Sequence, residues 1–226
     1  MKVLITGANR GLGYELCRVY AQSGHDVYAG VLEKADHSDL KALKAEYPEI
    51  TVLPMDVTDR AQVIEAAKVC GELDVLINVA GVLCLSDHKL PITDADPNDF
   101  KVALDVNVMG AAHVIHAFHK RIVKDGWFID ITSEGGSLQN IGTVYPAYSV
   151  SKAAENKLIG IFRKTVSGYH IYAMHPGRMN TEMGREFAQI EASESAQCIY
   201  ELTAGKRSVS PEADWFIDYR GYPMEV

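Results

Sequence analysis

The hydrophobic residues of this chain fall in short apolar runs that alternate with longer amphipathic segments. The runs are rich in Val, Ile and Leu, which is typical of strands buried on both faces of a sheet. They predict strands at Lys2–Thr6, Asp26–Val31, Ile50–Val57, Leu73–Val79, Trp127–Thr132, Tyr169–Met174 and Asp214–Tyr219. The segments between them have apolar residues at helical spacing. They predict helices at Tyr14–Ser23, Ser38–Tyr47, Ala61–Val69, Pro97–Val123, Tyr148–Val166 and Ser193–Ala204.

Strand and helix alternate from the first residues onward. This order implies right-handed crossovers and a parallel sheet that is covered on both faces. The chain has 226 residues, of which 47% are hydrophobic, so it can bury one full core. We therefore predict a single-domain Rossmann fold of the α/β class over residues 1–226, with a doubly wound parallel sheet of about seven strands and helices on both faces. Ligands of such folds bind at the carboxyl ends of the strands.

A glycine-rich turn joins the first predicted strand to the first predicted helix. It contains Gly7, Asn9, Arg10, Gly11, Leu12 and Gly13. Glycine lets the backbone approach a pyrophosphate, whose charge then lies at the helix N-terminus. The glycine triplet alone is also compatible with an ordinary tight turn. Its position between a strand and a helix favours a dinucleotide site.

The second predicted strand bears on the choice of dinucleotide. NAD-binding folds usually place an acidic residue at its end, bonded to the ribose hydroxyls. Here the strand ends at Val31 and Leu32, and Glu33 comes late. Arg10 is suited to face a 2′-phosphate, although it is equally a common solvated turn residue. The pattern favours NADP(H) over NAD(H).

Asp56 and Val57 close the third predicted strand, at the edge where the dinucleotide is expected. A carboxylate there can reach an adenine amine. Asp56, Thr58 and Asp59 are also alternative caps of the following helix.

Composition narrows the classes of partner and the compartment. The formal charge is −8, and no basic stripe suggests nucleic-acid binding. No apolar stretch approaches the length of a membrane span, and the N-terminal apolar run is too short for a signal peptide. The four cysteines are scattered without CxxC spacing, as expected of reduced thiols. We therefore expect a cytoplasmic protein without a nucleic-acid or membrane partner.

Tyr148 and Lys152 are four residues apart in a predicted helix. Residues at this spacing share a helix face, so the two side chains should project side by side. A lysine cation beside a phenol stabilises the phenolate. The phenol is then suited to exchange a proton with a substrate oxygen near neutral pH.

Together with the glycine turn, several further motifs follow one another in a recognisable order. They are Asn78-Val79-Ala80-Gly81, Asn107, Ser133, Tyr148-x-x-x-Lys152 and Pro176-Gly177. In this order the chain resembles the short-chain dehydrogenase/reductase family over essentially its whole length. The compact length and the segment from Trp215 to Gly221 are most similar to the C-factor or sniffer-like carbonyl reductases.

The resemblance implies a role for each matching residue. Tyr148 is implied as the general acid and base, and Ser133 as the group that holds the substrate oxygen. Lys152 is implied to bond the nicotinamide ribose and to make Tyr148 more acidic. Asn107 is implied to break the local helical bonding and to hold a water that links Lys152 to solvent. Ser137 remains an alternative to Ser133, because fifteen residues from Ser133 to Tyr148 exceed the commonest family spacing.

Further residues are implied to contact the cofactor. Asn78 steadies the strand, whereas Val79 departs from the asparagine usual in the family. Ala80 and Gly81 follow it. The segment after the sixth predicted strand is implied to pack on the nicotinamide carboxamide. Its implied contact residues are Pro176, Gly177, Met179 and Thr181.

The activity predicted from these features is an NADP(H)-dependent carbonyl reductase or alcohol dehydrogenase acting on a small ketone, aldehyde or secondary alcohol. A nucleotide-binding sensor without turnover and a sugar-nucleotide epimerase are the alternatives. We predict no metal site, since His113, His116 and His119 fan out around their helix. The resemblance is compatible with a homodimer or homotetramer.

Overall fold

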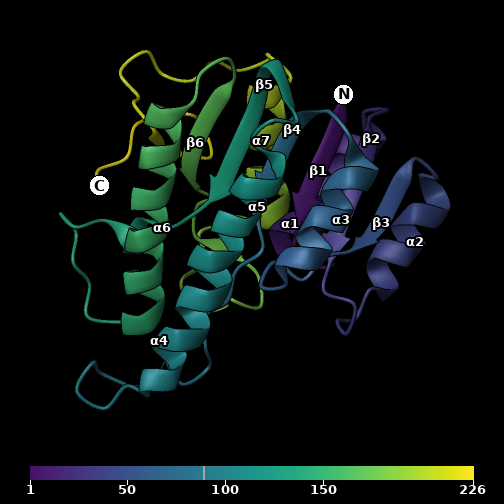
Figure 1. Ribbon diagram of the computed structural model, residues 1–226. Helices are drawn as coiled ribbons and strands as arrows, with labels where there is room; N and C mark the ends of the chain where they lie inside the picture. The colour runs from purple at the N-terminus through teal and green to yellow at the C-terminus, as the bar shows by residue number, and fades with distance from the viewer. Residues whose placement is uncertain (89) are drawn as a thin grey trace.

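The computed structural model describes residues 1–88 and 90–226. Its centre is a seven-stranded sheet in the order β3-β2-β1-β4-β5-β6-β9, in which all neighbouring strands are parallel (Figure 1). The strands are β1 (Lys2–Thr6), β2 (Asp26–Val31), β3 (Ile50–Pro54), β4 (Leu73–Asn78), β5 (Ile122–Ile131), β6 (His170–His175) and β9 (Phe216–Asp218). The predicted fold class is confirmed.

Helices cover both faces of this sheet. One face carries α1 (Gly11–Gln22), α2 (Ser38–Glu46) and α7 (Ala192–Thr203). The other carries α3 (Arg60–Cys70), α4 (Pro97–Ala103), α5 (Gly110–Phe118) and α6 (Pro146–Thr165). In Figure 1, α3 to α6 lie in front of the sheet and α1 and α7 lie behind it. Of the helices in the described ranges, none is long and apolar enough to cross a membrane.

The alternation of side chains along each strand builds a core on each face. Val3 and Ile5 of β1 pack in the cluster with α1 and α7, whereas Leu4 packs in the cluster with α3, α5 and α6. All three side chains are fully buried. Continuous apolar strands therefore follow from a sheet that is buried on both sides.

The predicted helix over Pro97–Val123 differs most from the structure; the predicted strand over Ile50–Val57 also ends earlier, at Pro54. The predicted helix is divided into α4, a π-helical turn at Leu104–Met109, and α5, which ends at Phe118. Ile122 then pairs with Leu73 as the first residue of β5. Ile122 and Val123 are apolar at spacings that fit either element, so only the pairing with β4 separates strand from helix.

Two short elements lie beyond β6, near the carboxyl edge of the sheet. They are a 3-10 turn at Arg185–Phe187 and a two-stranded ribbon of β7 (Met179–Asn180) and β8 (Ile190–Glu191). A second 3-10 turn, Glu134–Gly136, follows β5. These segments and the glycine turn surround the carboxyl ends of the central strands.

We predict that Gly13→Ala destabilises the junction of β1 and α1. A Cβ at Gly13 would lie 2.2 Å from the carbonyl oxygen of Gly7, so the backbone would have to move. Overpacking of this kind costs about 1–3 kcal/mol, which urea unfolding would measure. Gly142→Ala is the control, because its Cβ would meet no atom of the described residues within 4 Å. Equal stability of the two variants would contradict the packing argument.

Candidate active site

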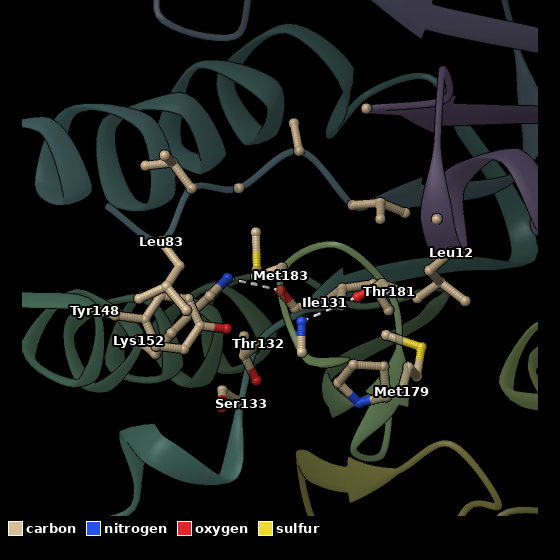
Figure 2. Close-up of a pocket in the computed structure, with 18 of the residues that line it drawn as sticks. Leu12, Leu83, Ile131, Thr132, Ser133, Tyr148, Lys152, Met179, Thr181 and Met183 are labelled. Atoms are coloured by element: carbon tan, nitrogen blue, oxygen red, sulfur yellow. Dashed lines mark hydrogen bonds between the residues drawn. The ribbon is translucent and has the colours of Figure 1, made fainter. Parts of the chain in front are cut away.

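A large cavity of about 1700 Å³ opens at the carboxyl ends of the strands. It is lined by the glycine turn, the segments after β3, β4, β5 and β6, and the first turns of α6. Figure 2 shows side chains from these separate segments converging on it. The cavity therefore lies where a doubly wound fold places its ligand.

The glycine turn forms one wall. Gly7 and Gly11 have φ angles of 62° and 53°, which glycine adopts without strain. A Cβ on Gly7 would lie 3.0 Å from the backbone of Ala80, so that wall is built by close backbone approach. No side chain caps the start of α1 among the described residues, which leaves its first amides available to an anion.

Most of the residues predicted to bind the cofactor line this cavity. They are Gly7, Asn9, Arg10, Gly11, Leu12, Asp56, Val57, Ala80, Gly81, Tyr148, Lys152, Pro176, Gly177, Met179 and Thr181. Gly13 and Asn78 lie behind its wall. Gly13 packs α1 against the backbone of Gly7, and Asn78 is buried within the sheet.

Two polar side chains of the cavity, Arg10 and Asp56, are expected to lie near the adenosine half of the cofactor. Arg10 forms an exposed ion pair with Glu182, a residue that the sequence alone did not single out. Asp56 accepts hydrogen bonds from the amide of Thr58 at 2.9 Å and from its hydroxyl at 2.7 Å. The cap of α3 is Asp59, which accepts from the amides of Ala61 and Gln62. Asp56 is thus left at the cavity wall.

Tyr148 and Lys152 extend from the first turns of α6 into the same cavity. Figure 2 shows both side chains reaching toward the end of β5, where Thr132 and Ser133 lie. The Lys152 Nζ is 5.7 Å from the centroid of the Tyr148 ring. The predicted juxtaposition of phenol and ammonium is therefore present.

Lys152 is held rigidly as a buried cation. Only 3% of the residue is exposed, and Nζ donates a hydrogen bond to the Ile131 carbonyl at 2.9 Å. Nζ also lies 2.6 Å from Oε2 of Glu155. Burial works to lower the pKa of Lys152, but the negative charge of Glu155 and the Tyr148 oxygen outweigh it and raise that pKa. The side chain therefore keeps its proton.

Both candidate serines line the cavity. The Ser133 Oγ accepts one hydrogen bond, from the Gly135 amide at 3.0 Å. The Ser137 Oγ accepts two, from the amides of Gln139 and Asn140 at 3.2 Å each. Ser133 stands two residues after the end of β5, and its oxygen has the greater capacity left for a ligand.

Asn107 lies beside Lys152 without lining the cavity. It occupies the π-helical turn, so the local departure from α-helical bonding implied by the family resemblance is present. Its amide Nδ2 donates to the Val82 carbonyl at 3.0 Å and to the Ser151 hydroxyl at 2.8 Å, and its Oδ1 accepts from the Val82 amide. These bonds fix the segment that follows β4 against α6.

Asp87 is a functional residue that sequence reasoning missed. It is 2% exposed and accepts hydrogen bonds from the amides of Ala147 at 3.0 Å and Tyr148 at 2.9 Å. Tyr145, at the cap position of α6, supplies no side-chain bond. Asp87 therefore anchors the start of the helix that carries Tyr148. Nothing local in the sequence signals this contact, because the partners are some sixty residues apart.

Two buried carboxyl groups were also missed. Asp130 and Glu155 are fully buried; Asp130 stands within an apolar run, whereas Glu155 is followed by Asn156 and Lys157. Asn78 donates a hydrogen bond to Asp130 and accepts one from the Thr6 hydroxyl at 2.7 Å. Desolvation raises the pKa of both carboxyl groups. An acidic residue within Phe128-Ile129-Asp130-Ile131 was the available signal.

A charged cluster lies next to Ser133 at the cavity wall. The Arg178 Nε donates to Oε1 of Glu134 at 2.6 Å, and the Glu134 amide donates to Nδ1 of His175 at 3.3 Å. Burial works to raise the pKa of Glu134, but Arg178 and His175 outweigh it and lower that pKa. Burial lowers the pKa of His175. These contacts hold the segment after β6 against the end of β5.

The three histidines of the predicted long helix bind separate protein groups. His113 contacts the Val57 carbonyl at 2.9 Å, His116 contacts Arg60 at 2.9 Å, and His119 contacts the Ile115 carbonyl at 3.1 Å. Among the described residues, no group of three or more His, Cys, Asp or Glu side chains is arranged to hold a metal ion.

Comparison of the sequence with known proteins finds one family and several of its members. Residues 1–192 match the family described as short chain dehydrogenase. The short chain dehydrogenase tazN of Aspergillus terreus is 31% identical over 198 residues, which cover 80% of this chain and 41% of that protein. The chain thus spans less than half the length of this relative.

Two solved structures share the whole fold. A putative short-chain dehydrogenase/reductase from Burkholderia multivorans with bound NADP has a TM-score of 0.89 at 25% identity, covering 99% of this chain and 98% of that one. The carbonyl reductase Sniffer of D. melanogaster has a TM-score of 0.88 at 21% identity, covering 100% and 99%. At 21% identity, the similarity to Sniffer establishes the fold only.

We predict that Asp87→Ala impairs both stability and turnover. Losing the anchor of α6 should cost about 1–2 kcal/mol and lower kcat about tenfold, since the first turn of α6 positions Tyr148. Urea unfolding and steady-state kinetics would measure the two effects. Asp59→Ala is the matched control, because it removes the cap of α3 away from Lys152. A loss of kcat in that variant as large as in Asp87→Ala would contradict a specific positioning effect.

Proposed function

Because the chain belongs to the short-chain dehydrogenase family of NAD(P)-dependent oxidoreductases, as its motifs predict, we propose that it is an NADP(H)-dependent carbonyl reductase. It reduces a small ketone or aldehyde, and in reverse it oxidises the corresponding alcohol. The observation that carries this proposal is the convergence of Tyr148, Lys152 and Ser133 on the cavity walled by the glycine turn.

The residues of the cavity fit a dinucleotide. The backbone of Gly7 and Gly11 offers a surface without side chains where a pyrophosphate needs close approach. Asp56 and Val57 line the cavity, and we assign to them the contact with the adenine. Gly81 leaves room next to Lys152, whose Nζ would lie 3.6 Å from a Cβ there. Pro176, Gly177, Met179 and Thr181 form the opposite wall.

The protein supplies orientation and a proton, while the nicotinamide cofactor supplies the hydride. Ser133 donates a hydrogen bond to the substrate oxygen and holds it against Tyr148. Tyr148 gives its phenolic proton to that oxygen as the carbonyl is reduced. The Lys152 cation stabilises the phenolate that remains. Asn107 positions the backbone beside Lys152, and we assign to it the water through which Lys152 recovers a proton from solvent.

Preference for NADP(H) rests on charge at the adenosine end. Among the described residues, β2 ends at Val31 and is followed by Leu32, and the carboxylates that line the cavity after it, Asp36 and Asp39, come later in the chain. Arg10 is 60% exposed in its side chain, and its partner Glu182 is 77% exposed. Exposed pairs of this kind contribute little energy, so a 2′-phosphate can displace Glu182 from Arg10. The NADP bound to the Burkholderia multivorans relative is consistent with this choice.

Apolar and aromatic side chains shape the substrate end. Leu83, Val144, Tyr145, Met183 and Phe187 line the cavity together with Tyr148. Tyr145 and Phe187 meet edge to face, with ring centroids 6.4 Å apart. Such a wall favours a carbonyl compound with an apolar or aromatic substituent.

The proposal includes a cytoplasmic location and a homo-oligomer. The support for an oligomer is a set of large apolar side chains exposed on α4, the π-helical turn and α6. They are Val102, Leu104, Met109, Val150 and Ile161. Burying such side chains against a second copy is favourable.

We predict that Tyr148→Phe abolishes turnover without abolishing cofactor binding. Loss of the proton donor should lower kcat by about 100-fold or more, whereas the Kd for NADPH should stay within about threefold. Loss of NADPH absorbance with a panel of aldehydes, ketones and quinones measures the rate, and NADPH fluorescence measures binding. Tyr28→Phe, on β2, is the control. A wild-type chain that binds NADPH but turns over no member of the panel would favour the nucleotide sensor instead.

We predict opposite effects of two substitutions on cofactor choice. Arg10→Ser should weaken NADPH binding about tenfold, or ~1.4 kcal/mol, and leave NADH binding nearly unchanged. Glu182→Gln should strengthen NADPH binding a few-fold, because it releases Arg10 from its partner. Separate fluorescence titrations with the two cofactors measure this. Equal changes for NADPH and NADH would show that Arg10 does not contact the 2′-phosphate.

A further inference from the structure

Two carboxyl groups and one ammonium are buried together beneath the active site. Lys152 lies 2.6 Å from Glu155, and Glu155 and Asp130 are close enough that each carboxyl group influences the pKa of the other. All three residues are at most 3% exposed. The mechanism of reduction given above uses Lys152 but neither carboxyl group.

The oxygens of the carboxyl pair indicate a shared proton. Within the described part of the chain, Oδ2 of Asp130 and Oε1 of Glu155 find no hydrogen-bond donor. Two ionised carboxylates are both acceptors only, so neither can satisfy the other. If one of the two carboxyl groups carries a proton, it can donate a hydrogen bond to the other and so supply the missing donor. Desolvation raises the pKa of both groups, which favours retention of that proton at neutral pH.

The shared proton determines the charge of the cluster. With one proton on the pair, a single negative charge faces the single positive charge of Lys152. Buried charges are tolerated when they are paired in this way. The cluster is then neutral before Tyr148 ionises.

Lys152 therefore has two alternative anionic partners. One is the carboxyl pair, in contact with Nζ through Glu155. The other is the phenolate of Tyr148, whose ring centroid is 5.7 Å from Nζ. Attraction between charges weakens with distance, and a cation already neutralised by the nearer anion stabilises the farther one less.

We propose that Glu155 and Asp130 are positioning residues that neutralise Lys152 and so keep Tyr148 in its proton-donating form, which poises the site for carbonyl reduction over alcohol oxidation. This inference rests on the proposed function, since it assigns a preferred direction to the same site. It differs from a purely structural role because it predicts a change in pH dependence.

Other charged groups face the Tyr148 side of the site, and the substitutions tested below leave them in place. They are Asp87, which accepts from the Tyr148 amide, and Glu134, Arg178 and His175 beside Ser133. The titratable groups that act on Lys152 are Tyr148, Glu155 and Asp130. The remaining elements packed around it contribute neutral polar groups. These are Thr6 on β1, Asn78 on β4, Asn107 in the π-helical turn and Asn156 on α6.

The test compares Glu155→Gln, Asp130→Asn and the double variant with the wild-type chain. Rates of 4-nitrobenzaldehyde reduction by NADPH, and of 4-nitrobenzyl alcohol oxidation by NADP+, are measured across pH. Reduction needs the phenol and falls as pH rises, whereas oxidation needs the phenolate and rises. Removing the negative charge beside Lys152 favours the phenolate, so both transitions should move to lower pH.

The variants should fall in a defined order. Asp130→Asn should leave the transitions close to those of the wild-type chain, because Glu155 stays ionised against Lys152. Glu155→Gln should lower the pH of both transitions by about one unit, and the double variant should lower it by more. The ratio of kcat for oxidation to kcat for reduction at pH 7 should rise about tenfold for each unit. Glu155→Asp should restore the wild-type profile in part. Transitions that stay unchanged in Glu155→Gln and the double variant would overturn the inference.

Infrared spectroscopy of the full chain tests the shared proton without turnover. The wild-type chain at neutral pH should show the band of a protonated carboxyl group. Asp130→Asn should abolish that band while keeping the ion pair between Lys152 and Glu155. Absence of the band in the wild-type chain, or its persistence in Asp130→Asn, would overturn the inference even if Glu155→Gln fails to fold.

A wild-type chain that reduces no carbonyl compound overturns the proposed function and the assigned direction with it. An active wild-type chain with unmoved transitions overturns the inference alone.

Discussion

The buried ammonium of Lys152 is the constraint around which the active site is arranged. A cation with 3% of its residue exposed requires partners, and it has the Ile131 carbonyl on β5 and the Glu155 carboxylate on α6. These contacts hold α6 to the carboxyl end of β5 and fix the direction in which Tyr148 projects. The geometry of the candidate active site and the stability of the helix–sheet junction thus depend on the same charge.

Polar contacts between segments distant in sequence complete this arrangement. Asp87 anchors the first turn of α6, Asn107 clamps the chain after β4, and Asn78 links Thr6 on β1 to Asp130 on β5. Each is buried, so each must find a partner within the protein. The carboxyl ends of β1, β4 and β5 and the start of α6 are thereby held in one rigid unit, to which the more exposed cofactor-side residues Arg10 and Glu182 are attached.

Much of the fold could be predicted because local patterns and the global topology agree. Apolar runs of strand length alternating with amphipathic segments admit few arrangements other than a doubly wound sheet. The prediction was wrong where a pattern was locally ambiguous. Ile122 and Val123 continue a helical spacing, yet they form the start of β5, because Leu73 offers a pairing partner that only the assembled sheet provides.

The sequence by itself determined the family, the glycine turn, and the phenol and ammonium on one helix face, since these depend on residue type and short spacing. Only the tertiary structure decided which of Asp56, Thr58 and Asp59 caps α3, that Arg10 pairs with Glu182, and that Asp87 and Asp130 are buried beside α6, the helix that carries Tyr148 and Lys152. The physical reason is that charge pairing and burial depend on distance in space. Residues separated along the chain by dozens of positions acquire that distance only when the sheet is formed.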